Sequence, residues 1–233
     1  MSITINIKSQ NVDRDVVIPV EWKDITVKYW GELSTIIKKH YTEATKDVKK
    51  EESQKHDLLK KDLLSDITKD IKLTDAQTVK MNSDIFSYIT GLTKEETSWV
   101  DINQVNKVLS LVNTLTEEYK PKGLRSFEFE GSTYYFPSEY FRKSTYGDFI
   151  ESTQLDMYIK DMENGRFDVL PEQMAILCKK VDEEVDLDNI DEKTELFKQL
   201  RMDVVWEFSF FLSKRTTASL SLIQTFLGEE LTI

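Results

Sequence analysis

The residues that most often carry catalysis are scarce in this sequence. His40 and His56 are its two histidines, and Cys178 is its one cysteine. A cysteine acts as a nucleophile when a base lies beside it, so a Cys–His pair is the first arrangement to consider. Cys178, however, ends the apolar run 174–178, where a small buried side chain is the ordinary interpretation. A zinc site needs about four such ligands at motif spacing, and the chain does not supply them.

Carboxylates are abundant and could in principle provide acid–base chemistry. Glu32 and Glu151 each stand two positions after an aromatic residue, and a pair of carboxylates is the machinery of glycosidases. Because acidic residues are common throughout the chain, an exposed helix face or a nearby backbone contact is the simpler interpretation of both. The sequence therefore predicts no catalytic residues and no enzymatic activity.

The acidic run 182–195 is the one stretch whose residues partly match the spacing of a calcium-binding loop. Asp186 and Asp188 alternate as oxygen ligands do, but Ile190 interrupts the series and no glycine follows to make the sharp turn. A solvated helix start is the simpler interpretation, and binding of a divalent ion there is left open. The glycines are all isolated, so no glycine-rich phosphate loop exists. We therefore predict no metal and no cofactor.

Aromatic residues are the more unusual resource, and they gather around two similar motifs. They are Trp22, Tyr29, Trp30, Tyr134, Tyr135, Phe136, Tyr140, Phe141, Tyr146 and Phe149. Filling of a core where strands meet helices is the default interpretation. An exposed fraction would suit a protein interface, where aromatic side chains are enriched.

The composition of the chain limits the class of protein to which these residues belong. The chain has 233 residues, of which 39% are hydrophobic and 31% are charged, as expected of a globular protein with a sizeable core. No apolar run approaches the roughly 18 residues of a membrane-spanning helix, and no secretory signal is visible, so we expect no membrane partner. A single cysteine suits a reducing compartment. The net charge of −11 opposes binding to a phosphate backbone, so no sequence-specific nucleic-acid partner is expected.

The sequence contains an internal similarity. Residues 17–22 and 135–140 both read apolar-apolar-Pro-x-Glu-aromatic, and both continue as Thr-x-x-x-aromatic-x-Glu, from Thr26 and Thr145. Alternating apolar residues precede each motif, as in a β-hairpin, and 130–132 is a good turn for the second. Amphipathic helical patterns follow both motifs. The open alternative is one α+β domain that has two similar hairpins.

These patterns predict an α+β protein made of two related copies of a β-hairpin packed on helices. The first copy spans 1–122 and the second spans 123–233, with the boundary at a Pro- and Gly-containing stretch. The first copy is longer because it carries a charged insertion at about 43–72, whose leucines and isoleucines recur at helical spacing.

The first copy resembles small tail-region proteins of tailed bacteriophages. The residues that carry the resemblance are Pro19, Trp22, Thr26, Tyr29 and Leu33, followed by the helix that ends in Ile-Thr-Gly-Leu. The style of the chain, rich in lysine, aspartate and isoleucine, is also similar to virion proteins of crAss-like short-tailed phages. The second copy departs from the pattern, with tyrosine in place of the tryptophan.

The resemblance implies a non-enzymatic structural protein with no active site to carry over. In one role the chain is a connector or ring subunit of the portal–tail region, in contact with copies of itself, the portal and other tail proteins. It would then be located in the virion after assembly in the cytoplasm of the bacterial host. In the alternative role it is a tail assembly chaperone that is left out of the particle. A third class, a small enzyme that uses surface carboxylates, would need a concave pocket that joins Glu32 or Glu151 to a second perturbed acid.

Overall fold

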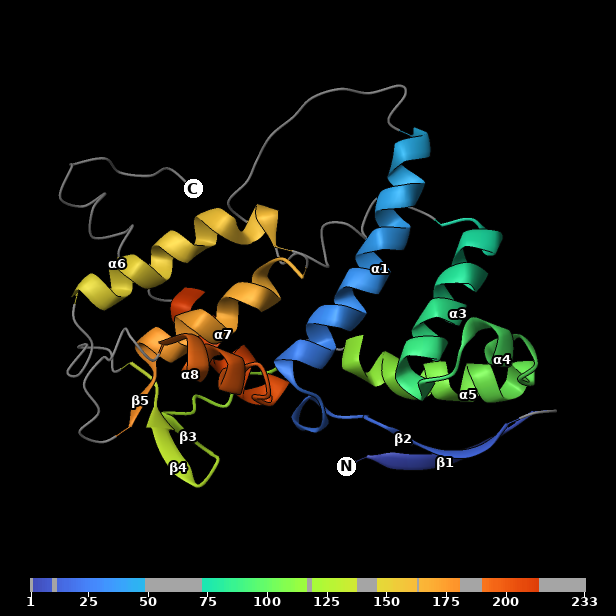
Figure 1. Cartoon of the computed structure of the whole chain (residues 1–233), viewed down its shortest axis with the longest axis horizontal. Helices are drawn as coiled ribbons and strands as arrows, with labels where there is room; N and C mark the ends of the chain where they lie inside the picture. Colours follow the sequence, from blue (N-terminus) through green and yellow to red (C-terminus); the bar gives the residue numbers. More distant parts are fainter. Residues whose placement is uncertain are drawn as a thin grey trace. The chain divides into compact units, whose positions relative to one another are not determined.

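The protein is a mixed helical and β-strand protein of the α+β class. The computed structural model describes residues 2–9, 12–48, 73–116, 119–137, 146–162, 164–180 and 190–213. It divides into two compact units, Met1–Glu118 (unit 1) and Tyr119–Ile233 (unit 2), each with its own small sheet and its own helices (Figure 1).

Unit 1 begins with a β-hairpin and continues with helices. In chain order, its elements are β1 (Ile3–Lys8), β2 (Asp13–Ile18), η1 (Trp22–Asp24), α1 (Val27–Val48), α3 (Asp75–Thr90), α4 (Lys94–Ser98), α5 (Ile102–Val112) and η2 (Asn113–Thr116). The two strands are antiparallel, with Ile3 opposite Ile18 and Lys8 opposite Asp13. Alternate side chains Ile5, Ile7 and Val16 are buried while their neighbours are exposed, because successive side chains of a strand point to opposite faces.

Local signals in the sequence explain where the helices of unit 1 begin and end. Thr74 and Thr93 each accept a hydrogen bond from the backbone N–H three residues on, which makes α3 and α4 start with capping boxes. α3 ends at Gly91, whose φ of 66° lies in the left-handed region that glycine adopts without strain.

The helices of unit 1 pack on one another and on the hairpin. α1 packs against α3, and both α3 and α5 contact β2. α1 runs on to Val48, and Ala44 is buried. Residues 43–48 therefore belong to the first long helix, and the remainder of the predicted insertion, 49–72, lies outside the described residues.

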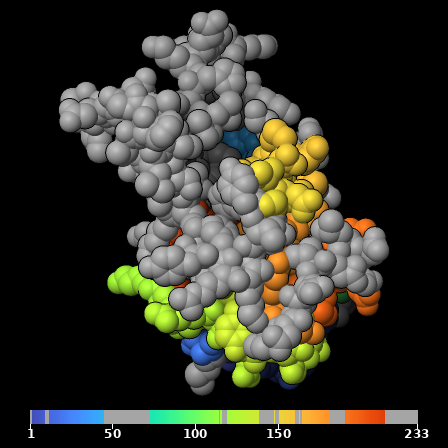
Figure 2. Space-filling view, turned by 90° about the vertical axis from the view of Figure 1, so that its left-hand side faces the viewer, coloured from blue at the N-terminus to red at the C-terminus, as the bar shows by residue number. Residues whose placement is uncertain are grey.

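Unit 2 contains a three-stranded antiparallel sheet and several helices. In chain order, its elements are β3 (Ser126–Phe129), β4 (Ser132–Tyr135), α6 (Tyr146–Gln154), η3 (Leu155–Asp161), α7 (Arg166–Leu177), β5 (Lys179–Lys180), α8 (Ile190–Phe197) and a helical stretch at 202–213. The strand order is β3-β4-β5, and in Figure 2 the yellow-green atoms of β3 and β4 adjoin the orange segment that contains β5. Glu130 and Gly131 both have positive φ, as a two-residue hairpin turn of the favoured type requires.

The core of unit 2 is built around α7 and the helical stretch 202–213. α7 is buried along almost its whole length, and it packs against α6, η3 and α8. Phe197 of α8 is fully buried, and its ring meets those of Tyr134 at 5.1 Å and Phe127 at 6.1 Å. One aromatic cluster thus joins the sheet to the helices. None of the helices described in either unit is both long enough and apolar enough to cross a membrane.

Candidate functional site

The residues of the hypothetical Cys–His pair lie in different units. His40 is buried on α1 of unit 1, whereas Cys178 is fully buried just after α7 in unit 2. His56 lies outside the described residues. Cys178 is the small buried side chain that the apolar run predicts.

His40 belongs to a polar cluster that links three helices of unit 1. Its Nε2 lies 2.9 Å from Oδ2 of Asp84 on α3. The other carboxylate oxygen of Asp84 lies 2.7 Å from Nζ of Lys94 on α4. Burial raises the pKa of Asp84, but the hydrogen bonds and electrostatic attraction of Lys94 and His40 outweigh burial and hold the pKa below its ordinary value. The carboxylate is therefore ionised and satisfies the polar atom of a buried histidine.

This cluster predicts unequal effects of two substitutions in unit 1. Asp84→Asn is expected to lower the free energy of unfolding by about 1–2 kcal/mol, because it weakens the hydrogen bond to buried His40. Lys94→Ala is expected to cost less than about 1 kcal/mol, because the lysine side chain is mostly exposed and its ion pair is screened. Urea unfolding of the two variants measures the difference. Equal losses in the free energy of unfolding would contradict the view that Asp84 stabilises unit 1 through its hydrogen bond to His40.

The two candidate carboxylates have different surroundings. Glu32 on α1 accepts a 2.8 Å hydrogen bond from the Tyr88 hydroxyl of α3. The ring of Tyr88 also lies 5.1 Å from that of Tyr29. Glu151 is exposed on α6 of unit 2. Glu32 therefore helps to fasten α3 to α1 through a side-chain contact with a residue 56 positions away, and not through the exposed face or nearby backbone contact that the sequence suggested.

The acidic run is only partly described. Residues 181–189 lie outside the described residues, and α8 begins at Ile190 with Asp191 and Glu192 in its first turn. Acidic side chains there interact favourably with the helix dipole. Within the described ranges of the chain, no group of three or more His, Cys, Asp or Glu residues could hold a metal ion.

The aromatic residues divide into buried and exposed members. Trp30, Tyr134 and Phe136 are buried. Trp22 is half-buried and meets Trp30 edge-to-face at 4.8 Å, and Tyr135 is 42% exposed. Tyr29 is half-buried, and the remaining members, Tyr140, Phe141 and the side chains of Tyr146 and Phe149, lie outside the described part.

The most elaborate polar site is formed by a carboxylate in unit 2. Glu207, on the helical stretch 202–213, is only 5% exposed. Its Oε2 accepts hydrogen bonds from the backbone N–H groups of Gly123 at 2.9 Å and Leu124 at 3.1 Å. Its Oε1 accepts from the Tyr119 hydroxyl at 2.8 Å and from the backbone N–H of Lys122. One carboxylate thus binds three consecutive backbone donors and a phenol.

The electrostatics of Glu207 follow from these donors. Burial by itself raises the pKa of a carboxyl group, because it penalises the charged form. The hydrogen bonds from Lys122, Tyr119, Leu124 and Gly123 outweigh this penalty and lower the pKa of Glu207 below its ordinary value. The ionised carboxylate therefore holds the segment 119–124, which leads into β3, against the helix.

Sequence reasoning did not single out this site, although one signal was present. Glu207 interrupts the apolar run 204–212, and a charged residue on an apolar helix face must find partners when it is buried. The donors lie more than 80 positions earlier in the chain, in a stretch whose Pro and Gly had marked it only as a boundary.

Comparison with known proteins gives no match: no protein-family model, curated protein or solved structure is significantly similar to this chain.

Proposed function

We propose that this chain is a non-enzymatic structural protein of a tailed-phage virion, a connector or ring subunit of the portal–tail region. It assembles through protein–protein contacts with copies of itself, with the portal and with other tail proteins. Its place is the virion, after assembly in the cytoplasm of the bacterial host.

The observation that carries the proposal is the corner between the hairpin and α1. The residues that give the chain its phage-like pattern have packing roles in this corner. Pro19 follows β2 directly and is buried, and Leu33 is buried on α1. Thr26 accepts a hydrogen bond from the N–H of Tyr29 at the start of α1. The pattern is thus explained by a folded scaffold and not by groups arranged for chemistry.

Exposed apolar side chains favour a role in assembly. Trp99 and Ile102, which flank the start of α5, are 54% and 65% exposed. In unit 2, Met157 and Tyr158 of η3 are also exposed. Aromatic residues and methionine are enriched where proteins contact each other, so these positions suit contacts with neighbouring subunits.

The charge of the chain also suits a place beside the genome channel. With a net charge of −11, the surface repels a phosphate backbone on average. A ring subunit that DNA must pass benefits from such repulsion, because it limits sticking of the genome during ejection.

The two units are further proposed to be related copies. In unit 1 the hairpin is followed by Pro19 and by a helix that starts at Val27, directly after Thr26. In unit 2 the hairpin is followed by Pro137 and by a helix that starts at Tyr146, directly after Thr145. In the described part of the chain, α3, α4, α5 and η2 follow the first helix of unit 1, and η3, α7, α8 and the helical stretch 202–213 follow that of unit 2. Among the described residues the sheets differ, because β5 adds a third strand to unit 2 and no third strand is found in unit 1. A ring built from such a chain would show pseudo-symmetry at twice its subunit number.

The proposal is tested by gradient fractionation of a lysate from a phage that encodes this chain. The expected result is that the chain sediments with DNA-filled particles and stays with them after a high-salt wash. A chain that is abundant in the soluble lysate and missing from particles would instead be an assembly chaperone. Absence from both fractions would remove the phage assignment.

Removal of 49–72 is expected to leave both units folded. In the deletion variant, a short Gly–Ser linker joins α1 to α3, which pack directly on each other. We expect cooperative thermal unfolding to persist, while self-assembly or partner docking measured by sedimentation weakens. Loss of cooperative unfolding would show that 49–72 is part of the core of unit 1.

A further inference from the structure

The hairpin of unit 1 has an open edge on β1. Ser9 donates its backbone N–H to the carbonyl of Val12 next to the turn. Since bonded and non-bonded pairs alternate in an antiparallel ladder, Lys8, Asn6 and Thr4 direct their N–H and C=O groups away from β2. Among the described residues, no strand pairs with the other side of β1, so these groups form the outer edge of the described sheet.

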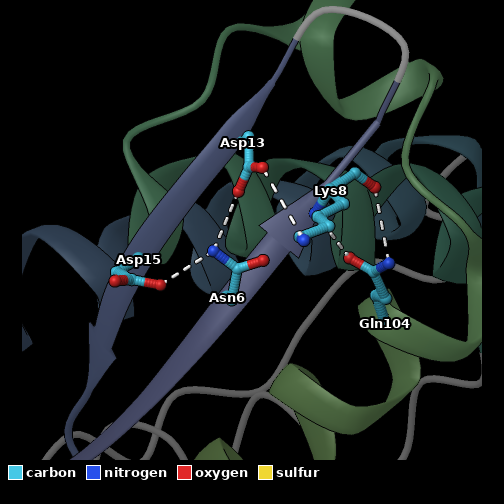
Figure 3. A network of polar contacts seen from close by, with 5 residues as sticks. All are labelled: Asn6, Lys8, Asp13, Asp15 and Gln104. Atoms are coloured by element: carbon cyan, nitrogen blue, oxygen red, sulfur yellow. Dashed lines mark hydrogen bonds and ion pairs between the residues drawn. The ribbon is translucent and has the colours of Figure 1, made fainter.

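One end of this edge is closed by a side chain of α5. The Gln104 amide accepts a hydrogen bond from the backbone N–H of Lys8 at 3.1 Å and donates one to the Lys8 carbonyl at 3.4 Å (Figure 3). A side-chain amide thus takes the place of a neighbouring strand at Lys8. Among the described residues, no hydrogen bond reaches the edge-facing backbone groups of Thr4 and Asn6, and both residues are exposed.

The two edges of the hairpin differ in charge. Proteins protect free strand edges with charged side chains, because unpaired backbone groups attract other strands. On β2, Asp13 and Asp15 are exposed side by side and hold the Asn6 amide between them (Figure 3). A second β2 would bring these acids against like charges. Thr4 and Asn6, along the open part of β1, are uncharged, so this edge lacks the protection that the β2 edge has.

We propose that a second copy of this chain pairs antiparallel with the β1 edge, with Ile5 opposite Ile5 of the second copy. Thr4 of each copy then lies opposite Asn6 of the other, and their edge-facing groups form four main-chain hydrogen bonds. This inference goes beyond the virion role, because it requires only two copies of the chain.

Three features favour a second copy in this register. Ile3 is 38% exposed on the same face as buried Ile5 and Ile7, and in this register it lies opposite Ile7 of the second copy. No two like charges face each other across the new pair. A shift of the register toward Lys8 is blocked, because Gln104 already occupies the backbone groups there. The paired strands form a four-stranded sheet with a continuous isoleucine face.

Two proline variants of the full chain test the proposal by analytical ultracentrifugation. Thr4→Pro removes an N–H that the hairpin itself does not use, so the hairpin can form while the pairing is blocked. Val17→Pro is the matched control, because Val17 lies opposite Thr4 and its N–H faces the other edge. Circular dichroism checks that both variants fold. The parent and Val17→Pro are expected to have the molar mass of two copies in solution, and Thr4→Pro is expected to have that of one copy. A monomeric parent, or an unchanged mass for folded Thr4→Pro, would overturn the proposal.

Hydrogen exchange on the parent chain provides a test that needs no substitution. The amide of Asn6 is expected to exchange more slowly as the protein concentration rises, because pairing protects it. The amide of Asp15, which faces the other edge of the same hairpin, is expected to keep one rate. Exchange at Asn6 that does not change with concentration would refute the pairing even if Thr4→Pro fails to fold.

Discussion

Replacement of Glu207 by alanine is expected to lower the free energy of unfolding of unit 2 by about 3 kcal/mol or more. The substitution leaves three backbone N–H groups and the Tyr119 hydroxyl without their acceptor. These donors are part-buried, and each one that loses its acceptor carries a desolvation cost. The substitution of Glu207 also releases the segment 119–124, which leads into β3. Urea unfolding followed through Trp206, the tryptophan of unit 2, measures the effect.

The isosteric variant Glu207→Gln separates charge from shape. We expect a loss of about 2 kcal/mol, because the amide NH₂ would face N–H donors instead of accepting from them. The pKa of Glu207 is lowered in the folded state, so its stabilisation is fully present above the ordinary value of 4.5 and is lost as the pH falls through the folded pKa. The difference between the parent and Glu207→Gln should therefore shrink below pH 4.5.

Glu195→Gln is the matched control, because Glu195 is an exposed glutamate of α8 that pairs with Lys198, the residue directly after this helix. It should change the free energy of unfolding by no more than about 0.5 kcal/mol. If Glu207→Gln were as mild as this control at neutral pH, the buried carboxylate would not be what holds the segment before β3.

Phe197→Ala is expected to be the most damaging change in the aromatic cluster, with a loss of about 3–5 kcal/mol in unit 2. The Phe197 side chain is fully buried, and its ring contacts those of Phe127, Phe129 and Tyr134. Alanine would leave a cavity where α8 meets the sheet, and the rigid strands cannot collapse to fill it.

Leu196→Ala is the control for this prediction, because Leu196 is the neighbouring residue of α8 and is 38% exposed. We expect its cost to stay below about 1 kcal/mol, since little packing is lost and alanine favours helix. Similar losses for the two variants would mean that α8 is not anchored through Phe197, contrary to the ring contacts.

The sequence predicted the hairpins and helices of this protein because their signals are local. Alternation at Ile5 and Ile7 identifies a strand that is half buried, and Glu130-Gly131 identifies the turn between β3 and β4. The capping box at Thr93 likewise fixes the start of α4 from a few neighbouring residues.

What the sequence did not predict depends on contacts between distant positions. Asp84 meets His40 across 44 positions, and Glu207 meets Gly123 across 84. Neither pairing has a local signature, because the sequence around a carboxylate does not show whether its partner is water or a distant donor of the protein. The extent of α1 was also missed, since the buried position of Ala44 depends on packing against α3 and not on a pattern within residues 43–72.

The central claim, that this chain is a permanent subunit of the portal–tail region, is tested most directly by absolute quantification in purified particles. Isotope-labelled reference peptides from this chain and from the portal protein would give the copy number of each. The account predicts a fixed ratio between the two proteins that does not change between preparations, and the ratio sets the number of subunits in the ring. A ratio near zero in particles, with abundant chain in the lysate, would contradict the account and favour the assembly chaperone.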